Sequence, residues 1–517
     1  MIQAQACNDH HPFERSRAVF DRLCDRLQGS EAFVMTHADL ERVLQTDGRE
    51  VLRQLFQDHL DLRGAREQAA PLLRVVGDDD IERPHHRDAT RTLRTLVGDL
   101  TVPRIGYGQR GTTSRFPMDA ALNLPTDPFS LGVRQVVALT VASASFEESV
   151  GHIATTTHTP IAKRQAENLA RAAAQDCDAF YVQKQAVKAT QTASRLVMSV
   201  DGKGVVVRLE DLRPATRRAA MQRKPKLKTR LTKGEKKYRK RMSTVAAVYT
   251  ISPYVRTADD VISDLRHEAR PERRPRPRPE NKRVWASLAK EPAEVIGEMF
   301  AEAERRDPQH QKQWVVVVDG NKDQLLIVQK EADRRGVSIT IVLDFIHVLQ
   351  YLWAASVAFH DETAPEREDW VLSRLGEILR GKAVDVAAGM RRSATLRDFN
   401  AKTRLPVDEC AGYLLTYKAY LHYDAYLRDG LPIASGVIEG ACRHLVKDRM
   451  DLSGAHWSLA GAEVVLKLRA IKASGDFADY WAFHEQCEFE RNHADRYQGA
   501  VPLPSCSRAR PKLRIVK

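Results

Sequence analysis

Residues 313–321 have the sequence QWVVVVDGN, and this segment sets the fold class. Its four consecutive valines show no alternation of polar and apolar side chains, so we expect other parts of the chain to cover both faces. Asp319 follows the last valine and precedes a glycine. The segment therefore predicts a central strand of a sheet with a carboxylate at its carboxyl end.

Further apolar runs on either side predict the rest of this sheet. RLVMSVDGKG (195–204) predicts a buried strand that ends at Asp201, and it shares the tetrad V-D-G-[KN] with the first segment. GVVVRLE (204–210) and STVAAVYTISPYV (243–255) predict a second and a third strand. Amphipathic helices at 292–306 and 321–336 then alternate with QWVVVV and with the strand VSITIVLDF (337–345). The order β-β-β-α-β-α-β predicts an α/β protein with the mixed sheet of a ribonuclease H-like core.

Asp201 and Asp319 predict phosphoryl-transfer chemistry. A carboxylate at the end of a buried strand is costly to desolvate, and two on neighbouring strands repel each other unless a cation lies between them. Paired Mg²⁺ or Mn²⁺ ions held by hard oxygen ligands meet this requirement. The alternative for each aspartate is an ordinary Asp-Gly turn. A third carboxylate would complete the site, and by residue type alone Glu409, Glu439, Glu463 and Glu485 all compete.

The positive charge of the chain is concentrated in one segment. The net charge is +13, and residues 213–241 hold fourteen Lys or Arg against one acid, Glu235. A concentrated basic tract is typical of a protein that binds a polyanion such as DNA, since phosphate contacts release condensed counterions. The alternative is a solvated charged segment without a ligand. A second basic segment, the Pro/Arg-rich stretch at 266–283, predicts an extended, exposed linker.

The first 182 residues predict a mainly helical DNA-binding region. Short amphipathic helices are expected within 1–88 and a β-hairpin at 92–107, with Gly98-Asp99 between its strands. Ser145 and Glu148 form a capping box that opens a helix, and a second helix is expected to start at Thr159-Pro160. If the pair is a helix-turn-helix, the second helix offers DNA the side chains of Lys163, Arg164, Gln165 and Asn168. The alternative is an ordinary helical hairpin.

The whole chain is expected to divide into six regions. The expected organisation is an N-terminal helical region (1–88), a hairpin and helix-turn-helix-like region (89–182), the first part of the core (183–345), a helical insertion (346–430), the last part of the core (431–495) and a basic tail (496–517). The seven cysteines include no C-x-x-C pair, so neither a zinc ribbon nor a disulfide framework is indicated. No stretch has the length of a membrane span, and we expect a cytoplasmic, nucleoid-associated bacterial protein.

Four blocks carry a more specific resemblance. MSVDGKG (198–204), WVVVVDGN (314–321), LDFIHVLQYLW (343–353) and ASGVIEGACRHLVKDRMDLSGAHW (434–457) resemble the ISKra family of insertion-sequence transposases, within the Mutator-like group of DDE transposases. The resemblance covers most of the chain from about residue 90 to 495. It implies a catalytic triad of Asp201, Asp319 and Glu439, which lie 118 and 120 residues apart.

The resemblance also implies a role for the [C/D]-x-x-H signature, which here is Asp344 to His347. His347 is expected to orient a phosphate oxygen or the displaced strand, and Asp344 to support the site. The alternative is that both cap the helix that follows. Arg443 and Lys447, four and eight residues after Glu439, are expected on one helical face with it, where they would grip phosphates together with Lys203. Outward, solvated charges are the alternative for this face.

These features together predict a DNA transposase. It would bind the terminal inverted repeats of its element, cleave double-stranded DNA with two Mg²⁺ ions, and join the freed 3′-OH to target DNA, acting at least as a homodimer. One alternative is a ribonuclease H-like nuclease or resolvase that cuts without joining. The other is a domesticated, non-catalytic DNA-binding regulator.

Overall fold

The structure is a computed structural model that describes residues 12–157, 159–184, 192–222, 227, 229–230, 239–268, 275–451 and 454–502. The chain forms two compact units. Unit 1 comprises residues 1–182 and 478–517, and unit 2 comprises residues 183–477. The segment 431–495 therefore divides between the two units. No helix among the described residues is long and apolar enough to cross a membrane.

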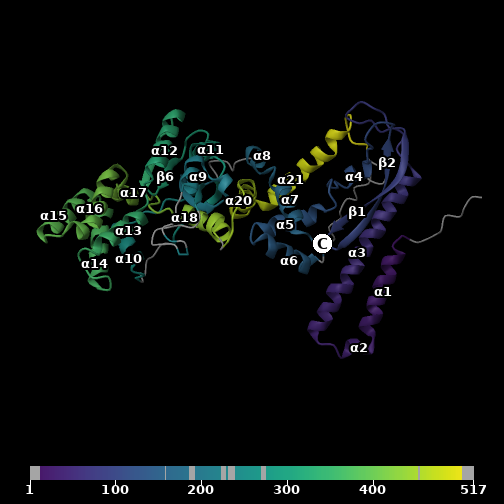
Figure 1. The fold of residues 1–517 in the computed structure, drawn as a ribbon, viewed down its shortest axis with the longest axis horizontal. Coiled ribbons are helices and arrows are strands. Elements are labelled where there is room, and N and C mark those ends of the chain that lie inside the picture. Colours follow the sequence, from purple (N-terminus) through teal and green to yellow (C-terminus); the bar gives the residue numbers. More distant parts are fainter. Residues whose placement is uncertain are drawn as a thin grey trace, which may run out of the picture. The chain divides into compact units, whose positions relative to one another are not determined.

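Unit 1 is built on a long helix beside a β-hairpin. Helix α3 packs against α1 and strand β2 (Figure 1), and it runs for 33 residues, so the expectation of short helices is wrong for this element. The side-chain amide of Gln57 bridges helix and hairpin, because it both donates to and accepts from the backbone of Thr101 at 2.8 Å. The elements of unit 1 are α1 (Glu14–Gln28), α2 (Ser30–Phe33), α3 (His37–Ala69), β1 (His85–Thr95), β2 (Gly98–Gly108), α4 (Pro117–Ala121), α5 (Leu131–Val141), α6 (Phe146–Thr157), α7 (Lys163–Ala174), α8 (Cys177–Gln183), α21 (Phe477–Asn492) and η5 (Ala494–Arg496).

The hairpin is confirmed, but its turn lies two residues earlier than predicted. Thr95 pairs with Gly98, so Leu96 and Val97 form the turn. The hydroxyl of Thr95 donates to the carbonyl of Gly98 and accepts from the N–H of Val97, which closes the turn. Gly98 has a φ of 123°, and this conformation explains why a glycine stands where the chain leaves the turn.

The expected helix pair at 145–175 forms, with one correction. The capping box of Ser145 and Glu148 is confirmed by reciprocal hydrogen bonds. The second helix, α7, begins at Lys163 rather than at Thr159-Pro160. The hydroxyl of Thr159 donates to the carbonyl of Thr95 at 2.7 Å. This bond holds the segment before the helix against the hairpin, so helical geometry starts only after Ala162.

Unit 2 contains a five-stranded mixed sheet in the order β5-β4-β3-β6-β7. Strands β3, β4 and β5 are antiparallel neighbours, whereas β6 and β7 run parallel to β3. Successive residues of a strand point to opposite faces, and Val315 to Val318 of β6 are all at most 1% exposed, so both faces are covered. Each buried valine contributes roughly 1.5–3 kcal/mol, which explains why the valine run occupies an interior strand.

The five strands follow one another with α11 and α12 between the last three, as expected, but the short helices α9 and α10 also separate the first three strands, and those strands are not the predicted ones. The segments predicted as first and second strands form one strand, β3, because its pairing with β4 continues without a break from Arg195 to Val206. The third antiparallel strand is β5, whose first four residues belong to the Pro/Arg segment expected to be a linker. Its exposed, charged first half concealed it from a hydrophobicity pattern, since β5 is an edge strand.

The helices of unit 2 surround this sheet and extend from it. Helix α11 packs on β3 and β4, while α18 and α20 contact the antiparallel strands. Helices α13 to α17 form in the region of the expected helical insertion, and Figure 1 shows them as one green group. The elements are β3 (Arg195–Val206), η2 (Leu209–Asp211), α9 (Pro214–Met221), β4 (Lys240–Ile251), α10 (Ala258–Leu265), β5 (Glu280–Ser287), α11 (Pro292–Arg306), β6 (Gln313–Val318), α12 (Lys322–Arg335), β7 (Thr340–Leu343), α13 (Phe345–Ser356), α14 (Glu366–Leu379), α15 (Ala383–Leu396), α16 (Ala401–Thr416), η3 (Lys418–Tyr420), α17 (Tyr423–Arg428), α18 (Gly436–Ala441), the π-helical η4 (Cys442–Lys447), α19 (Asp448–Met450) and α20 (Leu459–Ser474).

Much of the basic tract 213–241 and residues 269–274 of the Pro/Arg segment lie outside the described residues. The two ends of the tract are used by the fold. Arg213 pairs with Glu291, and Arg241 donates to the carbonyls of Leu288 and Asp211 at 2.7 and 2.9 Å. Arg217 and Arg218, on helix α9 between these ends, are exposed.

A buried glutamate makes the stability of the protein depend on pH. Glu67 of α3 is 0% exposed and accepts a hydrogen bond from the N–H of Ile105 at 3.0 Å. Burial raises the pKa of its carboxyl from 4.5 to about 7. The folded state therefore prefers the protonated form, and this contribution to stability is present below pH 4.5 and is lost as the pH rises through 7.

We predict that Glu67→Gln, which mimics the protonated acid, stabilises the protein relative to wild type at pH 8 by roughly 3 kcal/mol, because one pKa unit corresponds to about 1.4 kcal/mol. At pH 4.5 or below the two proteins are expected to be nearly equal. Chemical denaturation between pH 4.5 and 8 measures the difference, with the exposed Glu82→Gln as control. A difference that does not grow with pH would contradict the assignment.

Candidate active site

The register of three parallel strands places three aspartates in one row. The last paired residues of β3 and β6 are Ser199 and Val317, and Asp201 and Asp319 each lie two positions further on. Val318 of β6 pairs with Leu343 of β7, so Asp344 follows in the same row. Adjacent strands are about 4.8 Å apart. The sheet thus brings Asp201, Asp319 and Asp344 to neighbouring positions along one edge.

Asp201 lies in the middle of β3, and the prediction that it ends this strand is wrong. Asp201 nevertheless lies beyond the part of β3 that pairs with β6. No residue of β6 pairs with it there, and it stands in one row with Asp319 and Asp344. The carboxylate accepts hydrogen bonds from the N–H of Gly202 and, at 3.1 Å, from the thiol of Cys442. Burial, and then the charge of Asp201, raise the pKa of the Cys442 thiol, which keeps it a donor.

Asp319 stands in a tight loop between β6 and α12. Its carboxylate accepts from the N–H of Asn321 at 2.9 Å, and the side chain of Asn321 in turn caps α12. Gly320 has a φ of 93°, and an added Cβ would lie 3.0 Å from the hydroxyl of Tyr413 and 3.2 Å from Leu343. The V-D-G-N tetrad therefore has glycine at its third position for two reasons: the positive φ, and the lack of room for a Cβ.

Tyrosines of the helical insertion hold the backbone around these acids. The hydroxyl of Tyr413 donates to the carbonyl of Asp319 at 2.9 Å, and that of Tyr417 donates to the carbonyl of Gly320. The hydroxyl of the fully buried Tyr423 donates to the carbonyl of Leu343 at 2.7 Å. Burial raises the pKa of Tyr413 and of Tyr423, so both remain hydrogen-bond donors. The insertion thus positions the ends of β6 and β7.

Asp344 is a supporting residue in this geometry. It is 2% exposed, and its two carboxylate oxygens accept from the N–H of Ile346 at 2.9 Å and from the hydroxyl of Ser435. The first bond caps α13, as the alternative interpretation of Asp344 expected. The second ties β7 to the segment that precedes Glu439. Both oxygens are thus already used by the protein.

Among the four competing glutamates, Glu439 lines the same cavity as the aspartates. It lies on the short helix α18, which begins directly after Ser435. Its competitors lie elsewhere: the carboxylate of Glu463 accepts from the backbone N–H groups of Leu288 and Ala289, Glu485 accepts from the indole of Trp481 in unit 1, and Glu409 is exposed on α16. None of the three lines the cavity described next.

A small cavity brings the candidates together. It has a volume of 130 Å³ and is lined by Asp201, Asp319, Asp344, His347 and Glu439, together with Val200, Val317, Ile346, Gln350, Ser435 and Ile438. His347 is half-buried on the first turn of α13. Among the described residues, no group of three or more His, Cys, Asp or Glu side chains is close enough to hold a metal ion as it stands. The carboxylates share one cavity but are not drawn together into a coordination shell.

The predicted DNA contacts lie on exposed surfaces of separate elements. Lys163, Arg164, Gln165 and Asn168 are all exposed on α7. The carboxamide of Gln165 accepts from the N–H of Ala162, and that of Asn168 from Arg171. Lys203 is half-buried on β3. Arg443 and Lys447 are exposed on η4, but the π-helical turn changes the residue spacing per turn after α18, so they do not follow Glu439 at α-helical spacing.

Sequence reasoning missed Ser435, Cys442 and the three tyrosines. Their roles depend on contacts between segments roughly 80 to 240 residues apart in the chain. The one signal available was position, since Ser435 and Cys442 flank Glu439 within the block 434–457.

Comparisons with known proteins give little further information. No family model and no curated protein matches the chain. Among solved structures it is similar to a chain of the Drosophila P element transposase strand transfer complex, at 10% identity over 75% of this chain and 83% of that chain, with a TM-score of 0.22. A similarity at this level does not decide the fold or the function.

We predict that Ser435→Ala lowers the free energy of unfolding by about 1–3 kcal/mol, because it leaves one oxygen of the buried Asp344 carboxylate without its donor. Chemical denaturation measures this loss. Ser199→Ala is the matched control, because its hydroxyl is equally buried but has no hydrogen-bond partner. Equal effects of the two substitutions would contradict the supporting role of the Ser435–Asp344 bond.

Proposed function

We propose that this chain is a DNA transposase whose catalytic residues are Asp201, Asp319 and Glu439. One observation carries the proposal: three acids, predicted from sequence and separated by 118 and 120 residues, line one cavity of 130 Å³. The competing glutamates do not line it. The resemblance of four sequence blocks to ISKra-type transposases supports the same assignment.

We propose further that the sheet of unit 2 is the core of a ribonuclease H-like fold. Three antiparallel strands followed by two strands parallel to the first support this interpretation. The helical insertion between β7 and Glu439 supports it too, since it accounts for the long spacing before the third acid.

Mg²⁺ or Mn²⁺ is the cofactor that this donor set favours, because hard carboxylate oxygens select these ions. When bound, a pair of such ions would polarise the scissile phosphate and the attacking oxygen. Asp201, Asp319 and Glu439 would hold them, and Glu439, exposed on a short helix, is the side chain with most freedom to close the shell. Asp344 is already satisfied by Ile346 and Ser435 and would keep the strand ends in place.

The remaining residues would position DNA. His347 lines the cavity, and its imidazole would donate to a non-bridging phosphate oxygen. The basic residues of 223–238, with Lys203, Arg443 and Lys447, would contact the DNA backbone, and the exposed face of α7 would contact the inverted repeats. Joining two element ends requires at least two subunits, so the active form would be a homo-oligomer.

We predict that Asp201→Asn, Asp319→Asn and Glu439→Gln each reduce Mg²⁺-dependent cleavage of element-end DNA on the order of 10³-fold. Asparagine keeps the acceptor for the backbone N–H bonds of Asp201 and Asp319, so folding and DNA binding should change little. A gel assay of cleavage and strand joining, with Glu409→Gln as control, makes the measurement. Unchanged cleavage in one variant would remove that residue from the triad. Cleavage without joined product would favour a nuclease.

We also predict that binding to duplex DNA weakens steeply with salt and that the middle of the basic tract causes much of this dependence. Residues 223–238 hold eight Lys or Arg and one Glu. Replacing them with a Gly/Ser linker of equal length should lower the slope of log K against log salt by several units, at about 0.9 per phosphate contact. Fluorescence anisotropy across a salt series measures the slope. An unchanged slope would mean that the tract does not contact phosphates.

A further inference from the structure

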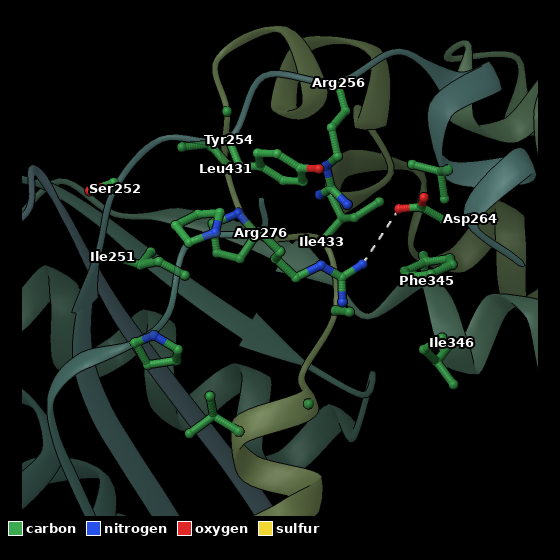
Figure 2. Close-up of a pocket in the computed structure, with 18 of the residues that line it drawn as sticks. Ile251, Ser252, Tyr254, Arg256, Asp264, Arg276, Phe345, Ile346, Leu431 and Ile433 are labelled. Atoms are coloured by element: carbon green, nitrogen blue, oxygen red, sulfur yellow. Dashed lines mark ion pairs between the residues drawn. The ribbon is translucent and has the colours of Figure 1, made fainter. Parts of the chain in front are cut away.

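A second and larger cavity in unit 2 adjoins the candidate active site. It has a volume of 390 Å³ and lies between the end of β4, helix α10, the segment 276–279, the start of α13 and the segment 430–437. The observed segment 276–279 belongs to the Pro/Arg stretch expected to be a mere linker. Figure 2 shows the side chain of Arg276 together with those of Tyr254, Phe345 and Ile433 around one space.

The two cavities share a wall. Ile346 lines both. Next to it in the sequence, Phe345 lines the larger cavity, whereas His347 lines the smaller one. On the facing segment, Gly436 and Val437 line the larger cavity, whereas Ile438 and Glu439 line the smaller one. The two cavities therefore lie side by side along the segments 345–347 and 436–439.

The chemistry of the large cavity fits a flat, apolar group with a negative charge attached. Its walls are mostly apolar, with rings from Tyr254 and Phe345 and branched side chains from Ile251 and Ile433. Two cations, Arg256 and Arg276, also face this space. One acid, Asp264, also lines the cavity, and its carboxylate lies 3.7 Å from the guanidinium of Arg276. Figure 2 shows this pair across the cavity.

The two arginines differ in how they are held. The side chain of Arg276 is 66% exposed and that of Asp264 is 15% exposed, and an ion pair of this length and exposure contributes little. Arg276 can therefore exchange the carboxylate for a phosphate. Arg256 is half-buried, its guanidinium carbon lies 5.0 Å from the centroid of the Tyr254 ring, and its buried Nε has no hydrogen-bond partner. Burial, and then the charge of Arg276, lower the pKa of Arg256, and the nearby carboxylates of Asp264 and Asp260 offset only part of this shift.

Size separates the roles of the cavities. Cavities that hold small ligands usually measure about 300–1,000 Å³. The 390 Å³ cavity reaches this range, and the 130 Å³ cavity does not. The small cavity is thus below the usual size of a site that holds a small ligand. The large one has room for a single base with its sugar and phosphate.

We propose that the large cavity binds one unpaired nucleotide of the DNA substrate, adjacent to the phosphate held in the small cavity. The base would lie between the apolar walls, and Arg276, with Arg256 behind it, would bind the phosphate. Unpairing a base costs a few kcal/mol, and stacking in a protein pocket offsets that cost. This inference rests on the proposed function, since it takes DNA as the substrate.

The test compares three duplexes bound to the full-length protein in EDTA, by fluorescence anisotropy. The duplexes are fully paired, or carry one bulged thymidine, or carry one bulged abasic site. Wild type is expected to bind the thymidine bulge about tenfold more tightly than the abasic bulge, through the buried base. Ser252→Trp, which places an indole at the rim of the cavity, is expected to remove this preference.

A matched pair of arginines tests the phosphate contact. Arg276 lines the cavity and Arg278 does not, although both are exposed in the same Pro/Arg alternation and each substitution removes one charge. Arg276→Ala should weaken binding of the thymidine bulge about fivefold more than binding of the paired duplex. Arg278→Ala should weaken both equally.

Equal binding of the two bulges by wild type, or equal behaviour of the two arginine variants, would overturn the proposal. Efficient displacement of the bulged duplex by millimolar deoxynucleoside monophosphate would also overturn it, because the site would then serve a free nucleotide. The assay needs no cleavage, so its outcome is independent of the triad variants. If the protein prefers the thymidine bulge but cleaves no DNA, the nucleotide site would stand and only the proposed catalytic activity would be wrong.

Discussion

Carboxylates side by side on neighbouring buried strands repel one another and lose hydration, and the structure around the candidate site offsets that cost. Strands β3, β6 and β7 are parallel and in register, which places Asp201, Asp319 and Asp344 in a row. Each of the three carboxylates accepts a backbone N–H of the residue one or two positions later. These backbone donors offset part of the free-energy cost of desolvating each carboxylate. The three acids differ in their second partner.

These second partners differ. The buried Asp344 receives the hydroxyl of Ser435, which uses up its carboxylate and links β7 to the helix of Glu439. Asp201 receives the thiol of Cys442, a weak donor that a stronger ligand can displace. Asp319 precedes an exposed loop, and its own carbonyl accepts a hydrogen bond from the hydroxyl of Tyr413. The three carboxylates are therefore held differently, and Asp344 is the buried one of the row.

The helical insertion holds the backbone around the candidate site, and it also accounts for the long sequence spacing between Asp319 and Glu439. Hydroxyl groups from α16 and α17 bind the carbonyls at the ends of β6 and β7, where the parallel sheet leaves no further strand to do so. The same insertion ends at the segment 430–437, which forms one wall of the large cavity and then continues into α18. The insertion thereby connects the strand ends, the third acid and the second cavity.

The sequence by itself determined the parts of this protein that depend on local patterns. The valine run predicted an interior strand, the V-D-G tetrads predicted two acids at one edge of the sheet, and the capping box of Ser145 and Glu148 formed as expected, because burial, turn chemistry and capping act over a few residues. Only the tertiary structure decided the rest. Unbroken pairing with β4 made one strand of two predicted ones, and an edge strand arose from the charged residues that begin β5. Glu439 rather than Glu463 lines the cavity because contacts across roughly 90 to 240 residues hold the segment around it, and no local pattern records such contacts.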